Sequence, residues 1–200
     1  NFFFAHPSGS VASSGGFSAS FVDCVIDGLN VPGQVNQEAG VFKVGSSALL
    51  TWDRCLVRNV TFSGVGTMLF APDRASGSEV RNSLFYNCDC GTTYSAIGGF
   101  RSAVSVRNCT FNNVNAVFRP TPDGAGYPMY VYNTLITDCG LLSRLNQDVL
   151  YLYNVNTNNT PPGAGYNLTV ATNITGHVPL YKDAAASNFH LRTVSPVVEI

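Results

Sequence analysis

A short motif recurs along this chain and constrains its fold more than any other feature. An apolar residue, an arginine or tyrosine and an asparagine follow one another in LVRN, EVRN, SVRN, YVYN and YLYN. With one degenerate early copy and one late copy, the anchor positions are Asp27, Asn59, Asn82, Asn108, Asn133, Asn154 and Asn173. Successive anchors lie between 19 (173 minus 154) and 32 (59 minus 27) residues apart. Repeats of this length indicate a solenoid in which each repeat stacks on the previous one.

Polarity alternates around each anchor. A valine or leucine comes two residues before it, and an arginine or tyrosine comes directly before it. Alternation over short β-branched runs, interrupted by Gly, Asn and Pro, predicts strands and tight turns, and no stretch has helical periodicity with caps. We therefore expect an all-β parallel solenoid with valines inside and arginines or tyrosines outside. The anchors should form a buried amide ladder. A separate stack in the interior should contain Phe62, Phe85 and Phe111.

The C-terminal segment adds a more specific pattern, NITGHVPLYKDAAASNFHLRTVSPVVEI (173–200). It is similar to the closing segment of many extracellular β-helix proteins, although Glu199 replaces the usual Asp and the following glycine is absent. The matching residues are Pro179-Leu180-Tyr181, Asp183, Asn188-Phe189-His190-Leu191 and Ser195-Pro196.

The chain thus resembles the right-handed parallel β-helix of the pectate-lyase-like superfamily, whose secreted members act on or display polysaccharide. The resemblance implies a single β-helix domain of about six to seven coils with an irregular C-terminal cap. Its expected parts are an N-terminal segment at 1–19, core coils at 20–160, and the last coil and cap at 161–200.

Composition restricts the class of partner and the compartment. Charged residues make up only 12% of the chain and the net charge is −1, which argues against a nucleic-acid partner. No apolar run is long enough to span a membrane. Six cysteines with few lysines favour a secreted, extracellular protein, and their spacing does not fit a metal site. Cys24 and Cys55, ahead of successive anchors, are the candidate disulfide pair.

Five N-glycosylation sequons occur in the chain. Asn59 and Asn108 coincide with ladder positions, where a buried amide could not carry a glycan, so we expect both to be bare. The remaining three, Asn158, Asn167 and Asn173, are the candidate acceptors.

Two groups of outward residues are candidates for binding carbohydrate or a protein partner. Tyrosines on two adjacent repeats should form a two-by-two patch, and arginines on three repeats should form a column beside Glu79. Each has a purely structural alternative, namely cross-strand tyrosine pairing and a solvated sheet edge. The candidates are Tyr130, Tyr132, Tyr151, Tyr153, Arg58, Arg81 and Arg107.

No catalytic residue is predicted. Lyases with this fold need a basic residue near a carboxylate cluster, and many use calcium, but neither Lys43 nor Lys182 lies on a face with such a cluster. Asp23, Asp27 and Asp53 are the only acidic group suited to a hydrolase.

The favoured function is therefore a non-catalytic extracellular module, structural or adhesive. It would bind a glycan surface, or copies of itself through the open ends of the solenoid to form a fibre. The alternative is a polysaccharide lyase or glycoside hydrolase, for which calcium would be the only cofactor.

Overall fold

The computed structural model describes residues 18–31, 40–44, 48–62, 68–72, 77–99, 101–120, 127–144, 149–162, 167–179, 181–183 and 188–191. Within these ranges all the regular elements are strands, as the alternating pattern predicts. They are β1 (Ala19–Val22), β2 (Val25–Asp27), β3 (Asn30–Val31), β4 (Gly40–Val44), β5 (Leu50–Asp53), β6 (Leu56–Phe62), β7 (Met68–Pro72), β8 (Ser78–Arg81), β9 (Leu84–Asp89), β10 (Ile97–Gly98), β11 (Val104–Arg107), β12 (Thr110–Val114), β13 (Phe118–Arg119), β14 (Met129–Thr137), β15 (Val149–Asn156), β16 (Asn167–Thr175), β17 (Tyr181–Asp183) and β18 (Asn188–Leu191).

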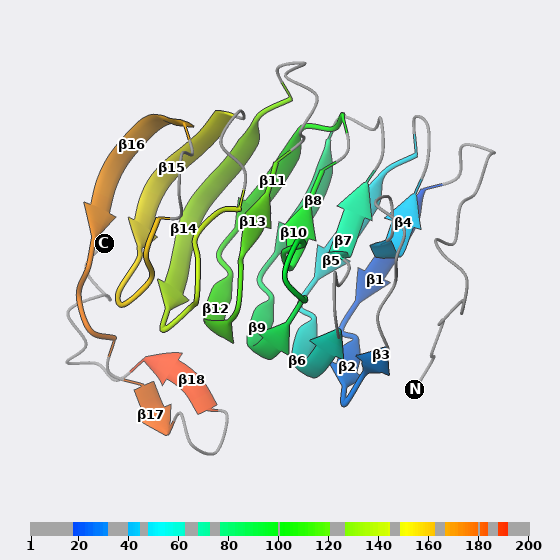
Figure 1. The fold of residues 1–200 in the computed structure, drawn as a ribbon, viewed down its shortest axis with the longest axis horizontal. Coiled ribbons are helices and arrows are strands. Elements are labelled where there is room, and N and C mark those ends of the chain that lie inside the picture. The colour runs from blue at the N-terminus through cyan, green and yellow to red at the C-terminus, as the bar shows by residue number, and fades with distance from the viewer. Residues whose placement is uncertain are drawn as a thin grey trace.

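Most strands belong to one curled parallel sheet (Figure 1). Its order runs β1-β5-β8-β11-β14 and then returns as β14-β12-β9-β6-β2, with β15 and β16 following β14. The path turns back on itself because β14 pairs with β11 through its first half and with β12 through its second half. Each repeat therefore contributes two successive strands that pair with the equivalent strands of the next repeat, an arrangement compatible with a solenoid.

Two smaller sheets complete the described structure. Strands β4, β7, β10 and β13 form a four-stranded parallel sheet, in which Ile97 pairs with both Phe70 and Phe118. Strands β17 and β18 pair antiparallel. The Tyr181 hydroxyl lies 3.1 Å from Thr137 Oγ1, so β17 contacts the end of β14.

The interior follows the predicted alternation. The apolar residues two before the anchors are at most 1% exposed, and they are Val57, Val80, Val106, Val131 and Leu152. Phe85 and Phe111 stack in register with ring centroids 4.7 Å apart, and Trp52 stacks on Phe85 at 6.0 Å. Phe62 does not join them, because the pairing of β6 with β9 places Val57, not Phe62, against Phe85.

The anchors do not form one column, so the predicted alignment of the repeats is wrong at Asn59. Asn59 lies in the column of Asn87, because Arg58 pairs with Tyr86 and Val60 with Cys88. The first ladder, which precedes the second strand of each repeat, contains Asp23, Arg54, Asn82, Asn108, Asn133 and Asn154. The second ladder, five residues further along, contains Gly28, Asn59, Asn87, Asn113, Asp138 and Asn159.

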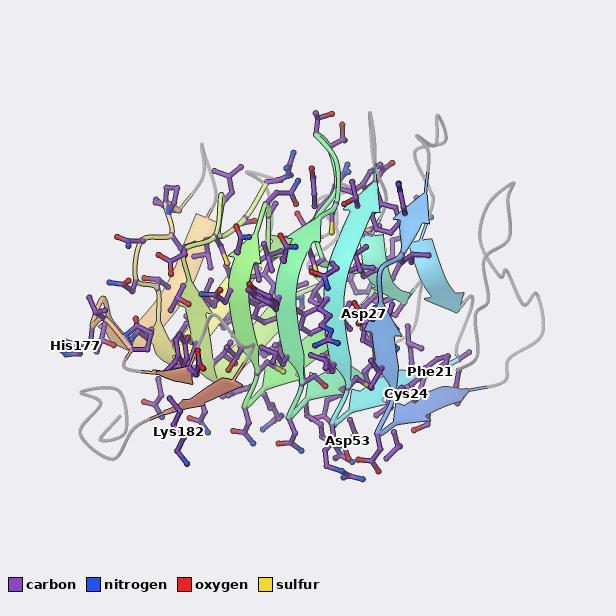
Figure 2. All side chains as sticks on the ribbon, turned by 90° about the horizontal axis from the view of Figure 1, so that it is seen from below. Phe21, Cys24, Asp27, Asp53, His177 and Lys182 are labelled. Atoms are coloured by element: carbon purple, nitrogen blue, oxygen red, sulfur yellow. The ribbon has the colours of Figure 1, made fainter. Side chains whose placement is uncertain are left out.

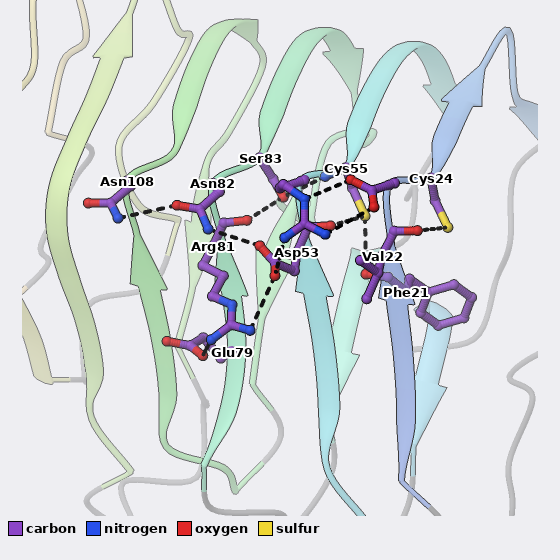
Figure 3. Close-up of polar contacts among 12 residues, drawn as sticks. Phe21, Val22, Cys24, Asp53, Cys55, Glu79, Arg81, Asn82, Ser83 and Asn108 are labelled. Atoms are coloured by element: carbon purple, nitrogen blue, oxygen red, sulfur yellow. Dashed lines mark hydrogen bonds and ion pairs between the residues drawn. The ribbon is translucent and has the colours of Figure 1, made fainter.

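Asp27 belongs to neither ladder, since it pairs with Arg58, but it terminates the second one by accepting a hydrogen bond from Asn59 Nδ2 at 2.9 Å. Asp53 terminates the first in the same way, 2.9 Å from Asn82 Nδ2 (Figure 3). In both ladders each described amide donates to the repeat before it, as Asn108 does to Asn82 at 3.2 Å.

The ladder residues share a left-handed backbone conformation. Their φ values lie between 47° for Asn133 and 71° for Gly28, a region that asparagine and glycine tolerate and other residues avoid. Most of the ladder asparagines are exposed, so the expectation that the amides are buried is wrong. Asparagine is required here because it turns the backbone and links neighbouring repeats at the surface.

Candidate functional site

One continuous surface carries most of the predicted binding residues. Strands β5, β8, β11, β14 and β15 pair in register, so their alternate side chains point away from the core in two columns. We call this surface the outward face. Its residues are Thr51, Glu79, Ser105, Tyr130 and Tyr151 in one column, and Asp53, Arg81, Arg107, Tyr132 and Tyr153 in the other.

Strands β5, β8 and β11 form a charged end of the outward face. Arg81 contacts Asp53 at 3.2 Å and Glu79 at 3.4 Å, as Figure 3 shows. Glu79 also accepts from Arg107 Nε at 3.1 Å. Each of these two arginines therefore has a carboxylate partner, and the charges of this end cancel.

The other end consists of the four predicted tyrosines, which do lie together. Tyr130 stacks on Tyr151 at 5.0 Å and Tyr132 stacks on Tyr153 at 4.9 Å, close to the strand spacing. Within each strand the two rings are nearly parallel, with centroids 6.4 and 6.5 Å apart. The rings form two side-by-side pairs, one layer upon the other. We call this arrangement the tyrosine slab.

The two ends meet between β11 and β14. The guanidinium carbon of Arg107 lies over the Tyr132 ring, 4.4 Å from its centroid, in a cation–π contact. The equivalent neighbour of Tyr130 is Ser105, whose side chain is too short to cover a ring in this way. On this side of the slab, Tyr132 is therefore covered by a cation and Tyr130 lies beside a small polar residue.

The predicted column of three arginines is wrong. Arg81 and Arg107 are in register, but Arg58 lies on the second strand of its repeat, paired with Asp27 and Tyr86. It forms an ion pair of 2.7 Å with Asp27. The same slip in the alignment that separated Asn59 from Asn82 separates Arg58 from the outward face.

The three carboxylates considered for hydrolysis do not form an acid–base pair. Arg54 bridges Asp23 at 2.7 Å and Asp53 at 3.0 Å, whereas Asp27 lies on a different strand group with Arg58. Hydrogen bonds from Arg54, Arg58 and Asn82 hold the pKa of their respective carboxyl partners below its usual value. A general acid needs a raised pKa, so the direction of these shifts is unfavourable for hydrolysis.

All six cysteines are free thiols. Cys24 and Cys55 face one another on neighbouring repeats, because Val22 pairs with Asp53 and Val25 with Leu56. The predicted disulfide between them is not formed, and their thiols donate to backbone carbonyls instead. The other four are buried, and burial raises the pKa of Cys88, Cys109 and Cys139 to about 12.

The sequon asparagines lie in three kinds of environment. Asn59 and Asn108 each use Nδ2, the atom that a glycan would occupy, in a ladder hydrogen bond. Asn158 Nδ2 donates to the Gly176 carbonyl at 2.9 Å. Asn167 and Asn173 lie in β16, and their side chains are outside the described part of the structure. The use of Asn158, Asn167 and Asn173 as glycan acceptors stays a prediction.

Two arginines that sequence reasoning did not single out stabilise a turn instead of lining the outward face. Arg144 Nη2 donates to the Gly91 carbonyl at 2.8 Å, and Arg119 Nη1 donates to the Thr93 carbonyl at 2.9 Å. Arg119 also lies over the Tyr94 ring at 4.3 Å. His177 and Lys182 are exposed at the C-terminal end, far from Asp53 and Asp27 (Figure 2).

No group of three or more His, Cys, Asp or Glu side chains suited to a metal ion occurs among the described residues. The described part of the chain also contains no helix long and apolar enough to cross a membrane. Comparison with protein-family models gives no match for this chain, and comparison with curated proteins gives none either.

Proposed function

We propose that this protein is a non-catalytic, extracellular β-helix module that binds carbohydrate through its outward face. The proposed fold is a right-handed parallel β-helix of about six to seven coils, as in the pectate-lyase-like superfamily. The in-register parallel pairing of the repeats and the turned-back sheet support it.

The observation that carries the binding function is the tyrosine slab beside paired charges. Four phenol rings and their hydroxyls, held within 6.5 Å of their neighbours, adjoin Arg81, Arg107 and Glu79. Aromatic rings pack on the C–H faces of sugars, while carboxylate and guanidinium groups hydrogen-bond to sugar hydroxyls. A rigid sheet fixes all of these groups in advance, which lowers the entropic cost of binding.

Catalysis is not favoured, because hydrogen bonds from Arg54 and Asn82 lower the pKa of Asp23 and Asp53, respectively. A glycoside hydrolase needs one carboxyl that stays protonated, and a lyase needs a base positioned to remove a proton. Assembly through the ends of the solenoid stays a prediction, because residues 1–17 and 192–200 lie outside the described structure.

The test is binding to a panel of soluble polysaccharides, measured by affinity electrophoresis and calorimetry. The wild type should bind at least one polysaccharide without releasing reducing ends or unsaturated product, with or without calcium. Tyr151→Ala should weaken binding at least tenfold, and Tyr181→Phe, which changes a tyrosine elsewhere, should not. Turnover, or binding insensitive to Tyr151, would contradict the proposal.

A further inference from the structure

The register places Ser105 beside the tyrosine slab, on the side away from β15. In the column Thr51, Glu79, Ser105, Tyr130 and Tyr151, serine separates a carboxylate from an aromatic ring. Glu79 and Tyr130 are two strands apart, which corresponds to about 9.6 Å. Because Ser105 is the smallest side chain of the column, it leaves a step between its two neighbours.

The face of Tyr130 towards Ser105 is the candidate surface for stacking. Its opposite face packs on Tyr151 at 5.0 Å. On the Ser105 side of the slab, Arg107 covers Tyr132 at 4.4 Å, but the register gives Tyr130 only Ser105 as its neighbour. A ring in van der Waals contact with Tyr130, at about 3.5–4.0 Å, would lie over Ser105. Its substituents would then reach towards Glu79.

The polar groups around this step select the class of ligand. Arg107 and Arg81 both contact Glu79, and Arg81 also contacts Asp53. Paired carboxylates and guanidinium groups still offer free lone pairs and N–H groups, but no excess positive charge. An anionic sugar would have to compete with Glu79 and Asp53 for the arginines, whereas neutral hydroxyls can bind to both kinds of group.

We infer that the outward face binds a neutral pyranose unit, stacked on Tyr130 over Ser105 and hydrogen-bonded to Glu79 and Arg107. This inference rests on the proposed function and specifies its ligand class and its subsite. It distinguishes the protein from one that binds polyuronates through its arginines.

The experiment compares Ser105→Tyr with Ser20→Tyr. Ser20 is exposed in β1 and pairs with Thr51, so it continues the same column outside the defined outward face. Soluble β-glucan, galactomannan and polygalacturonate serve as ligands. We expect wild type and Ser20→Tyr to bind a neutral polysaccharide equally. Ser105→Tyr should lose at least tenfold in affinity because its ring fills the step. Raising NaCl from low to high concentration should change the neutral affinity less than twofold, since no net charge is recognised.

Each contrary result has a separate meaning. If Ser105→Tyr binds like the wild type while Tyr151→Ala does not, the subsite is wrong and the proposed function stands. Stronger, salt-sensitive binding of polygalacturonate would overturn the neutral class. Failure of the wild type to bind any polysaccharide would overturn the proposed function itself. Ser105→Leu, with the same expected loss, replaces Ser105→Tyr if circular dichroism shows that the tyrosine variant does not fold.

Discussion

In the described part of the chain, aromatic rings stack in register both in the core and on the outward face. Phe85 and Phe111 stack inside at 4.7 Å with 0% exposure, and Tyr132 and Tyr153 stack outside at 4.9 Å and stay partly exposed. Their interplanar angles, 13° and 9°, are almost the same. The repeat geometry therefore determines stacking on both surfaces, and burial determines which stack stabilises the fold and which can meet a ligand.

The largest expected effect is on the inner stack. Phe111→Ala should remove about 3–5 kcal/mol from the free energy of unfolding, because it leaves a cavity between Phe85 and Phe118. Denaturant unfolding followed by circular dichroism measures this, with Tyr153→Ala as the matched outer variant. A cost for Phe111→Ala no greater than that for Tyr153→Ala would remove the distinction between the two stacks.

Replacing an asparagine of the first ladder should have the next largest effect on stability. Asn108→Ala loses its hydrogen bonds to Asn82 and Asn133 and puts alanine at a φ of 52°. The left-handed conformation alone costs about 1–2 kcal/mol for such a residue. Asn108→Gly keeps the backbone conformation and loses only the bonds, so its thermal midpoint should fall less. Equal losses would mean that the backbone conformation does not matter.

The outer stack should contribute less to stability than to binding. Tyr153→Ala should lose the stacking contribution of about 0.5–1.5 kcal/mol in addition to the burial of a partly exposed ring, while glycan affinity falls at least tenfold. Parallel measurements of denaturant midpoint and of affinity for the neutral polysaccharide check this. A large loss of stability without a loss of affinity would make the tyrosine slab purely structural.

A replacement away from both stacks should stabilise the chain slightly. Arg54 has a φ of 54° in the first ladder, where its neighbouring repeats carry Asp23 and Asn82. Arg54→Asn should relieve this strain and raise the thermal midpoint by a few degrees. Its ion pair with Asp23 is exposed, and the buried Asp53 keeps Arg81 and Asn82 as partners. Arg58→Asn, which loses an ion pair without any such strain, is the control and should give no gain.

The smallest effect should come from acid, through the aspartates that accept hydrogen bonds from Arg54, Arg58 and Asn82. Arg54 and Arg58 lower the pKa of Asp23 and Asp27, and Asn82 lowers that of Asp53. A depressed pKa in the folded state adds stability that is complete above the unfolded value, about 3.9, and is lost as the pH falls through the folded value. The thermal midpoint should be constant from pH 7 to pH 5 and should fall below about pH 4. Asp23→Asn should reduce that fall.

Several features of the fold could be predicted because they follow from the residue pattern within a single repeat. The inward valines, the parallel pairing and the grouping of four tyrosines follow from alternation around Tyr132 and Tyr153, whose repeats align without a slip. The asparagine at the turn follows from its tolerance of left-handed backbone. By contrast, Asn59 and Asn82 both end the same Val-Arg-Asn motif, yet they belong to different ladders. The motif fits either strand of a repeat, so only the pairing of β6 with β9 separates them.

The sequence by itself determined the all-β class, the inward and outward residues of each strand, and the cluster of tyrosines, because period-two alternation depends only on neighbouring residues. The tertiary structure alone decided which repeats are in register, and therefore that Arg58 leaves the outward face and that Ser105 stands beside Tyr130. Loops of unequal length join the strands, and sequence spacing cannot reveal how they close. Hydrogen bonding between distant strands fixes the columns, and the columns determine which side chains meet.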